Sequence, residues 1–288
     1  MMEDKMNIQW YPGHMTKTRR QIEADLKQVD AVCEIVDARI PVSSRNPDID
    51  SICGSKPRIV VLNRIDLADP AATKVWTAHY KSKGYTVVCT DCKSRKGISD
   101  FNPAVRAACK EKIERDQARG MNRPVRVMVV GIPNVGKSTL INQISGRKGA
   151  KAENRPGVTR GKQWVTVDSG LQLMDTPGIL WPKFEDPEVG MMLAYTGAVK
   201  EDVIDIEELA CRLMTLLHKY YPQALLERYK VEAEAGTPGH ELIQLAGRKR
   251  GYLLARGEID TERMSKVLID EFRSGKLGKF TLEMPEEV

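Results

Sequence analysis

The sequence predicts a doubly wound, mainly parallel α/β sheet followed by a small all-α domain. Two observations predict the sheet: short apolar runs typical of buried strands alternate with helical segments of about a dozen residues, and polar turns follow the runs. A third observation concerns the end of the chain. Beyond Glu185 the strand-like alternation stops and apolar residues recur at helical spacing. We therefore expect an α/β domain over residues 1–185 and a helical domain over residues 186–288.

Composition and cysteine usage restrict the class of protein. The 288 residues suffice for two domains with sizeable cores. No run of eighteen apolar residues exists and the polar N-terminus lacks a secretory pattern, so we expect a cytoplasmic protein with no membrane segment. The six scattered cysteines indicate reduced thiols, and the lone C-x-x-C pair of Cys89 and Cys92 lacks the second pair that a zinc site needs. The net charge of +6 permits a polyanionic partner without establishing one.

Four elements are expected in the first third of the chain. A helix with apolar positions three and four residues apart comes first, and two apolar runs that end at Asp37 and Asn63 indicate buried strands. Asp69 and Pro70 favour the N-cap and first turn of a second helix, which should stop at Gly84. The expected ranges are 16–29 for the first helix, 31–36 and 58–62 for the strands, and 70–83 for the second helix.

The remaining elements of the sheet domain follow in the same alternation. A strand and one long helix precede a linker, and a strand, a helix and a β-hairpin come after it. The turn of the hairpin is expected at Ser169 and Gly170. The expected ranges before the linker are 85–89 for the strand and 98–119 for the long helix, and the linker covers 119–124. After it we expect a strand over 125–130, a helix that starts over 140–144, and a hairpin of strands 162–168 and 171–174.

The sequence GIPNVGKST at residues 131–139 lies between an expected strand and an expected helix, which is the structural context of a P-loop. The turn points backbone N–H groups inward at the positive end of the helix, and a small residue at Gly136 lets phosphates approach. Lys137 supplies a charge to the β- and γ-phosphates, and Ser138 can bind Mg²⁺. A chance match in a glycine-containing turn is the alternative, which the flanking strand and helix disfavour. The expected nucleotide-binding residues of the loop are Asn134, Val135, Gly136, Lys137, Ser138 and Thr139.

A second motif, Asn63-Arg64-Ile65-Asp66, resembles the N-K-x-D guanine motif of GTPases. Its aspartate accepts two hydrogen bonds that guanine offers and adenine does not. Arg64 stands where the family has lysine, so its stem can cover the base while the ammonium contact is changed. Asp91 and Cys92 lie where an S-A-K-like loop would close over the base.

A third motif, at residues 175–178 (DTPG), resembles the D-x-x-G motif of GTPases. The resemblance implies that Asp175 reaches Mg²⁺ through water and that the Gly178 N–H meets the γ-phosphate. Thr159 matches the threonine that completes the Mg²⁺ shell in GTPases. The implied metal ligands are therefore Ser138, Thr159 and Asp175, with GTP or GDP as the bound nucleotide.

The order of these motifs is unusual, because the guanine motif precedes the P-loop. A nucleotide site depends only on where loops lie in space, so the chain resembles a circularly permuted GTPase. With the segments 12–15 (PGHM), 37–41 (DARIP) and 175–183 (DTPGILWPK), nearly the whole chain resembles the ribosome biogenesis GTPase A (YlqF-like) family. This resemblance implies hydrolysis of GTP to GDP and phosphate in late assembly of the large ribosomal subunit, stimulated by that subunit. It implies rRNA and ribosomal proteins as partners, and we expect a monomer away from the ribosome.

Ile179 follows the D-x-x-G motif where Ras-like GTPases have the glutamine that orients the attacking water. The resemblance points to His14 as its replacement, acting with Lys137 and Thr159, whereas packing or capping beside Thr16 is the alternative role of His14. Asn134 resembles the asparagine of GTPases that bind K⁺ beside the nucleotide. Asparagine is common at this position whether or not K⁺ acts, so both alternatives stay open.

The resemblance also implies that the helical domain faces RNA. The switch segment after Gly178 runs straight into this domain, so a bound γ-phosphate can reposition it. A solvated surface is the competing interpretation of its basic residues. The alternative function is a nucleotide-gated RNA-binding module with incidental hydrolysis; the permuted order and the basic helical tail disfavour a signalling or transport GTPase. The candidate RNA-binding residues are Arg228, Lys230, Arg248, Lys249 and Arg250.

Overall fold

The computed structural model describes residues 22–47, 49–146, 163–176, 186–199 and 205–285. The chain divides into two compact units. Among the described residues, a sheet unit contains those up to 176 together with 283–285, and a helical unit contains those from 186 to 282.

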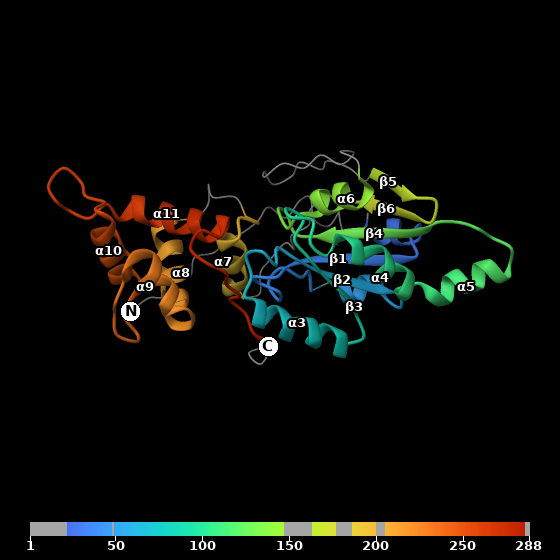
Figure 1. The fold of residues 1–288 in the computed structure, drawn as a ribbon, viewed down its shortest axis with the longest axis horizontal. Helices are drawn as coiled ribbons and strands as arrows, with labels where there is room; N and C mark the ends of the chain where they lie inside the picture. The colour runs from blue at the N-terminus through green and yellow to red at the C-terminus, as the bar shows by residue number, and fades with distance from the viewer. Residues whose placement is uncertain (1–21, 48, 147–162, 177–185, 200–204, 286–288) are drawn as a thin grey trace. The chain divides into compact units, whose positions relative to one another are not determined.

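The sheet unit is built on six strands in the order β3-β2-β1-β4-β6-β5 (Figure 1). All neighbouring pairs are parallel except β5 with β6, which form the expected antiparallel hairpin at one edge. The mainly parallel sheet predicted from the sequence is confirmed. The strands are β1 (Ala31–Asp37), β2 (Arg58–Asn63), β3 (Thr86–Thr90), β4 (Val125–Gly131), β5 (Gln163–Asp168) and β6 (Leu171–Asp175).

Helices connect the parallel strands and bury the apolar residues of the sheet. The side chain of Asp69 accepts hydrogen bonds from the N–H groups of Ala71 and Ala72, so the predicted N-cap is confirmed. Trp76 and Tyr80 pack one turn apart against the apolar side chains of β2. The helices are α2 (Ile49–Cys53), α3 (Pro70–Ser82), η2 (Ile98–Asp100, a 3₁₀ turn), α4 (Phe101–Ala108), α5 (Lys110–Ala118) and α6 (Lys137–Ser145).

The single long helix predicted over residues 98–119 is wrong, because the chain forms three pieces there. The break between α4 and α5 lies at Cys109, whose φ of −104° and ψ of 15° are not helical. Phe101, Val105 and Cys109 are buried, whereas α5 is polar and mostly exposed. The apolar stripe that holds α4 on the sheet therefore ends at Cys109, and the helix axis is free to change direction.

The predicted first helix lies only partly in the described residues. Residues 22–26 are helical, and Ile22, Leu26 and Val29 are buried in one hydrophobic cluster with β1 and β4. The helix ends at Leu26 rather than at Val29, and the part of the prediction over residues 16–21 lies outside the described residues.

The helical unit is all-α in its described residues apart from one isolated β-bridge. Helix α8 packs on α9, α10 and α11, and it begins where the Asp205 carboxylate accepts hydrogen bonds from the first turn. The side chain of Arg273 donates to the carbonyl oxygens of Ala194 and Tyr195, which closes the C-terminal end of α7. The helices are α7 (Pro187–Tyr195), α8 (Ile206–Tyr220), α9 (Pro222–Tyr229), α10 (Gly239–Arg250) and α11 (Thr261–Ser274).

After Leu282 the chain returns to the sheet unit. The carboxylate of Glu283 accepts hydrogen bonds from the N–H groups of Val42 and Ser43 and from the Ser43 hydroxyl, and its carbonyl accepts one from Trp76 Nε1 at 2.8 Å. Within the described residues, the helical unit thus ends before residue 283, whereas the sequence placed everything after 186 in the helical domain.

Two further expectations concern the chain as a whole. All six cysteines lie in the described residues and none of them forms a disulfide, as predicted. In the part of the chain that the structure describes, no helix is long and apolar enough to cross a membrane.

Candidate functional site

The loop between β4 and α6 has the backbone of a phosphate-binding turn. Gly131, Asn134 and Gly136 have positive φ values of 157°, 59° and 102°, and Gly136 is the N-cap of α6. Such alternation turns successive N–H groups toward one point at the start of a helix, where an anion is favoured. The strand, turn and helix predicted around the P-loop sequence are therefore confirmed as local structure.

Lys137 lies under this loop with its side chain buried. Its ammonium donates hydrogen bonds to the carbonyl oxygens of Gly131 at 2.9 Å and Ile132 at 2.8 Å. Burial lowers the pKa of Lys137 to about 8, against the opposing effect of the Asp175 carboxylate. A phosphate in the loop would supply the anion that a buried ammonium requires.

Ser138 and Asp175 are brought together at the other side of the loop. The Ser138 hydroxyl donates to Asp175 Oδ2 at 3.2 Å, and Thr176 Oγ1 fixes the end of β6 by donating to the Val129 carbonyl at 2.7 Å. Burial raises the pKa of Asp175, and its Oδ1 is buried without a hydrogen-bond partner among the described atoms. An oxygen in this position fits a cation, and hydroxyl and carboxylate oxygens are the ligands that Mg²⁺ takes.

The described residues contain no cluster of three or more His, Cys, Asp or Glu that could hold a metal ion. The predicted donor set does not require such a cluster, because it has one carboxylate, that of Asp175, and two hydroxyls, and Mg²⁺ in nucleotide sites takes only one or two carboxylates together with phosphate oxygens. The third predicted ligand, Thr159, lies outside the described residues.

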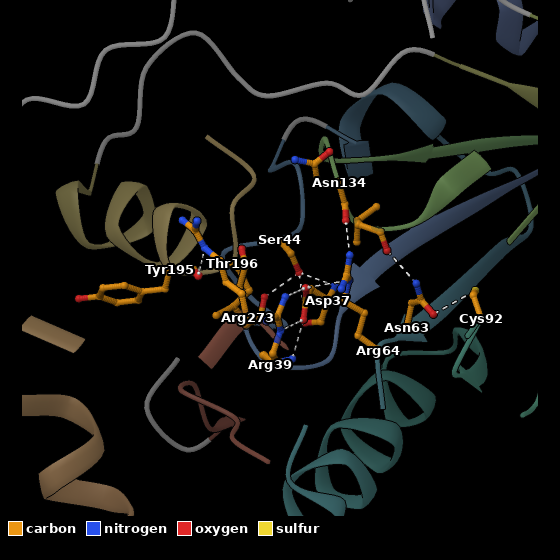
Figure 2. Close-up of polar contacts among 12 residues, drawn as sticks. Asp37, Arg39, Ser44, Asn63, Arg64, Cys92, Asn134, Tyr195, Thr196 and Arg273 are labelled. Carbon is orange, nitrogen blue, oxygen red and sulfur yellow. Dashed lines mark hydrogen bonds and ion pairs between the residues drawn. The ribbon is translucent and has the colours of Figure 1, made fainter. Parts of the chain in front are cut away.

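Asn63, the first residue of the guanine-type motif, ties three loops together (Figure 2). Its Nδ2 donates to the Val135 carbonyl at 2.7 Å, and its Oδ1 accepts from Thr90 Oγ1 at 3.0 Å and from the Cys92 thiol at 3.2 Å. Because its buried amide is hydrogen-bonded through both its nitrogen and its oxygen, Asn63 holds the P-loop beside the ends of β2 and β3. The role of Asn63 in the site is therefore to hold these loops together by hydrogen bonds.

Gly136 is required by this contact. A Cβ atom on Gly136 would lie 2.5 Å from Asn63 Nδ2, and the φ of 102° is itself rarely adopted by other residues. The sequence interpretation explained this glycine by phosphate approach; the structure adds that it makes room for the asparagine of the guanine-type motif.

Arg64 extends from the same strand end to the P-loop. Its Nη2 donates to the Asn134 carbonyl at 3.0 Å, and its Nε lies 3.9 Å from Asp37 Oδ2. Asp37 also receives a two-point contact from Arg39, at 2.9 Å and 2.7 Å, with both side chains buried. Burial acts to raise the pKa of Asp37, but the charges of Arg39 and Arg64 and the hydrogen bonds from Arg39 outweigh it and lower the pKa.

A pocket of about 280 Å³ opens between the ends of β2 and β3 and the start of α6. It is where the sequence placed a guanine base, and two of its lining residues, Lys93 and Gln143, were not predicted. Lys93 could have been found by extending the loop at Asp91 by one residue, whereas Gln143, on α6, carries no local signal. The lining residues that the sequence predicted are Asn63, Arg64, Asp66, Asp91, Cys92, Gly136 and Thr139.

The remaining predicted residues have other positions. Ile65 packs against the hydrophobic cluster of α3 instead of lining the pocket. Val135 is buried and contributes its carbonyl to Asn63. His14 and Gly178, like Thr159, lie outside the described residues, so their assignments stay predictions.

Fold and site together define the class: a P-loop GTPase in which the guanine-type motif comes before the P-loop in the chain. Comparison with known proteins agrees with this class. Residues 126–230 match the model of the family described as 50S ribosome-binding GTPase.

Similar proteins extend over nearly the full chain. Ribosome biogenesis GTPase A of Bacillus cereus is 46% identical over 98% of this chain and 95% of its own length, and that of Priestia megaterium is 45% identical over 98% of both. The GDP-bound structure of TM YlqF is 27% identical, with a TM-score of 0.69 over 93% of this chain and 100% of its own. The chain belongs to the ribosome biogenesis GTPase A family, and it is a GTP hydrolase.

Proposed function

We propose that this GTPase acts in late assembly of the large ribosomal subunit and that the subunit stimulates its hydrolysis of GTP. The observation that carries the proposal is the whole-length similarity to proteins named ribosome biogenesis GTPase A, joined to a family model described as 50S ribosome-binding. The bacterial relatives support action in the cytoplasm. Away from the ribosome we expect a monomer.

We assign the roles in the site as follows. The pocket beside Asp66 takes the guanine base, because a carboxylate there can accept both hydrogen bonds from its N1–H and exocyclic amine. The loop and Lys137 take the phosphates. Ser138, Asp175 and Thr159 hold Mg²⁺, which supplies charge stabilisation to the transferred phosphoryl group. The geometry that supports this assignment is the 3.2 Å contact between Ser138 and Asp175, together with the buried Asp175 Oδ1, which has no hydrogen-bond partner among the described residues.

The group that orients the attacking water is His14 in this proposal, since Ile179 cannot hydrogen-bond to water through its side chain. Imidazole acts by positioning the water and needs no proton abstraction. A His14→Ala variant is expected to bind GTP as the wild type does and to lose most of the turnover stimulated by the subunit. Unchanged stimulated turnover would show that His14 has only a packing or capping role.

Asn134 raises the further proposal of a K⁺ ion beside the nucleotide. The ion would supply part of the charge that an arginine finger brings in other GTPases, a position worth about 10³–10⁵ in rate. Turnover compared in KCl and NaCl at equal ionic strength tests it, and equal rates would exclude the ion.

The experiment that tests the main proposal is GTP turnover in potassium buffer, with purified large subunits, with small subunits and with neither. We expect strong stimulation by large subunits alone, and none in a Lys137→Ala variant, which controls for contaminating GTPases. Tight GTP binding without stimulation by large subunits would instead favour the nucleotide-gated RNA-binding module with incidental hydrolysis.

A further inference from the structure

The segment between α10 and α11, residues 251–259, forms a hairpin that is fixed by backbone hydrogen bonds. The Leu254 N–H donates to the Glu258 carbonyl at 2.8 Å, and the Asp260 N–H donates to the Tyr252 carbonyl at 2.9 Å. The Arg263 guanidinium lies 4.3 Å from the centre of the Tyr252 ring, which adds a contact at the base of the hairpin. In Figure 1 the hairpin is the orange-red loop that extends past the ends of α10 and α11. The hairpin is therefore an ordered loop that projects from the helical unit.

Two adjacent leucines stand exposed on this projection. Leu253 is 54% exposed and Leu254 is 50% exposed, the highest values among the exposed large apolar side chains of the described residues. Single exposed leucines are common on proteins, whereas two successive exposed leucines on an ordered hairpin concentrate apolar surface at one place, and exposed apolar patches mark binding surfaces. These leucines contribute little to the core of the helical unit, so their presence calls for a partner.

The charges around the leucines are mainly positive. Between residues 248 and 258 the chain has four basic residues, Arg248, Lys249, Arg250 and Arg256, and one acidic residue, Glu258. Of these, Arg250 lies 3.5 Å from Glu271 and contributes to an ion-pair cluster. Arg248, Lys249 and Arg256 are exposed.

The same cluster changes the set of candidate RNA-binding residues. Arg228 Nε donates to Glu271 Oε2 at 2.8 Å, and the Tyr229 hydroxyl donates to the same oxygen. These bonds and the charges of both arginines hold the pKa of Glu271 low. Arg228 and Arg250 are thus partly neutralised within the unit, and the positive surface is centred on the end of α10 and the hairpin.

We propose that the hairpin 251–259 docks on RNA. Arg248, Lys249 and Arg256 contact phosphates, while Leu253 and Leu254 lie against an unpaired base or the wide, shallow minor groove of an RNA helix. RNA is favoured over a protein partner because the exposed charges beside the leucines are predominantly basic. Apolar wedges flanked by basic side chains are used in this way by proteins that bind a minor groove. The inference rests on the proposed function, since the RNA would be rRNA of the large subunit.

The test is binding of the full-length protein, loaded with a non-hydrolysable GTP analogue, to large-subunit rRNA free of protein and to intact large subunits at several salt concentrations. A double variant, Leu253→Ser with Leu254→Ser, is expected to weaken binding to both by about tenfold or more, because burial of leucines is lost. The dependence of its affinity on salt should stay that of the wild type, since no charge is removed. Val75→Ser, at a position 41% exposed on α3, is the matched control and should bind as the wild type does.

The basic residues give the second arm of the test. Arg256→Gln and Lys249→Gln are each expected to lower the slope of log affinity against log salt by about 1. Lys110→Gln, on the exposed side of α5, should leave the slope unchanged. In all variants GTP affinity and basal turnover should stay at the wild-type value, which shows that the sheet unit is intact.

Other outcomes overturn the inference in distinguishable ways. If the leucine variant binds free rRNA as the wild type does but binds subunits less well, the hairpin docks on a ribosomal protein. If it binds both normally, the hairpin is no docking element, while the proposed function stands. If the wild type shows no preference for large-subunit rRNA over unrelated RNA and no affinity for subunits, both proposals fail.

Discussion

Arg64 Nη2 donates a hydrogen bond to the backbone carbonyl of Asn134 at 3.0 Å, so the guanine-type motif is fastened to the P-loop (Figure 2). The same side chain places its Nε 3.9 Å from the carboxylate of Asp37. A guanidinium can serve both partners at once because its donors point along two edges, whereas a lysine has one terminal nitrogen. The departure from N-K-x-D at Arg64 is therefore accommodated by a bridge from Asp37, at the end of β1, to the P-loop.

Replacement of Arg64 by lysine is expected to weaken GTP binding by roughly tenfold, since one hydrogen bond from a charged group to the Asn134 carbonyl is lost, at about 1.5 kcal/mol. Arg64→Ala should weaken it further. Equilibrium binding of a fluorescent GTP analogue measures both, with Arg115→Lys on exposed α5 as control. Wild-type affinity in Arg64→Lys would mean that the bridge to Asp37 contributes nothing to the site.

Gly136→Ala is expected to abolish tight nucleotide binding, because its Cβ would lie 2.5 Å from Asn63 Nδ2 and displace the loop. Gly146→Ala is the matched control: Gly146 also has a positive φ, of 65°, but no atom of the described residues lies within 4 Å of its Cβ position. Both variants should lose about 1 kcal/mol of folding stability from backbone strain. Equal nucleotide affinity in the two variants would contradict the steric argument.

Nucleotide binding near pH 8 is expected to take up about half a proton per protein. The pKa of Lys137 is about 8 in the free protein, below the ordinary value for lysine, so about half of this side chain is neutral at that pH. Phosphates favour the charged form and raise its pKa. Calorimetry in two buffers of different ionisation enthalpy measures the uptake, which should vanish near pH 6, where Lys137 is already charged.

The same shift predicts a pH dependence of folding. Between pH 8 and the ordinary lysine pKa of about 10.4, the unfolded chain holds a proton that the folded free protein has lost. The contribution of Lys137 to stability therefore rises with pH across that window. The free energies of unfolding of wild type and Lys137→Met, measured by denaturant titration, should converge as the pH rises. A difference that stays constant with pH would contradict this prediction.

Glu283→Ala is expected to destabilise the sheet unit by about 2–3 kcal/mol, because it leaves the N–H groups of Val42 and Ser43 without their acceptor. Trp76 fluorescence reports on the site directly, since its Nε1 donates to the Glu283 carbonyl. Glu111→Ala, on exposed α5, is the control. An unchanged unfolding midpoint in Glu283→Ala would show that the contacts of this side chain do not stabilise the sheet unit.

Strand positions were predictable to within a residue because the buried strands are short apolar runs, and those of β1 and β2 end at the polar residues Asp37 and Asn63. The break at Cys109 was not predictable, since the sequence around it keeps helical propensity. The break occurs where the buried apolar side of α4 ends, and that position is known only from the fold. The return of Glu283 was missed for a similar reason. Its partners lie some 240 positions away in the chain, and no local pattern encodes that contact.

For the candidate site, too, local patterns were predictable from the sequence and contacts between distant segments were not. Residues that we propose to bind the nucleotide through a local motif, such as Lys137 and Ser138, could be predicted from their spacing. The joint role of Asn63 and Gly136 could not, because it arises where two distant loops touch. The buried pair of Asp37 and Arg39 was recognised only as a family sequence, and its link to Arg64 emerges from the fold.

Because the chain returns to the sheet unit at Glu283, the helical unit is inserted within the sheet unit rather than appended to it. A stop codon near residue 186 would therefore remove more than the helices, since it also strips Glu283 from Val42 and Ser43. A faithful deletion would splice a flexible linker between residues 185 and 283. By the same logic, a protease that cuts the chain once before residue 186 would leave the contacts of Glu283 with Val42 and Ser43 as a non-covalent link between the two fragments.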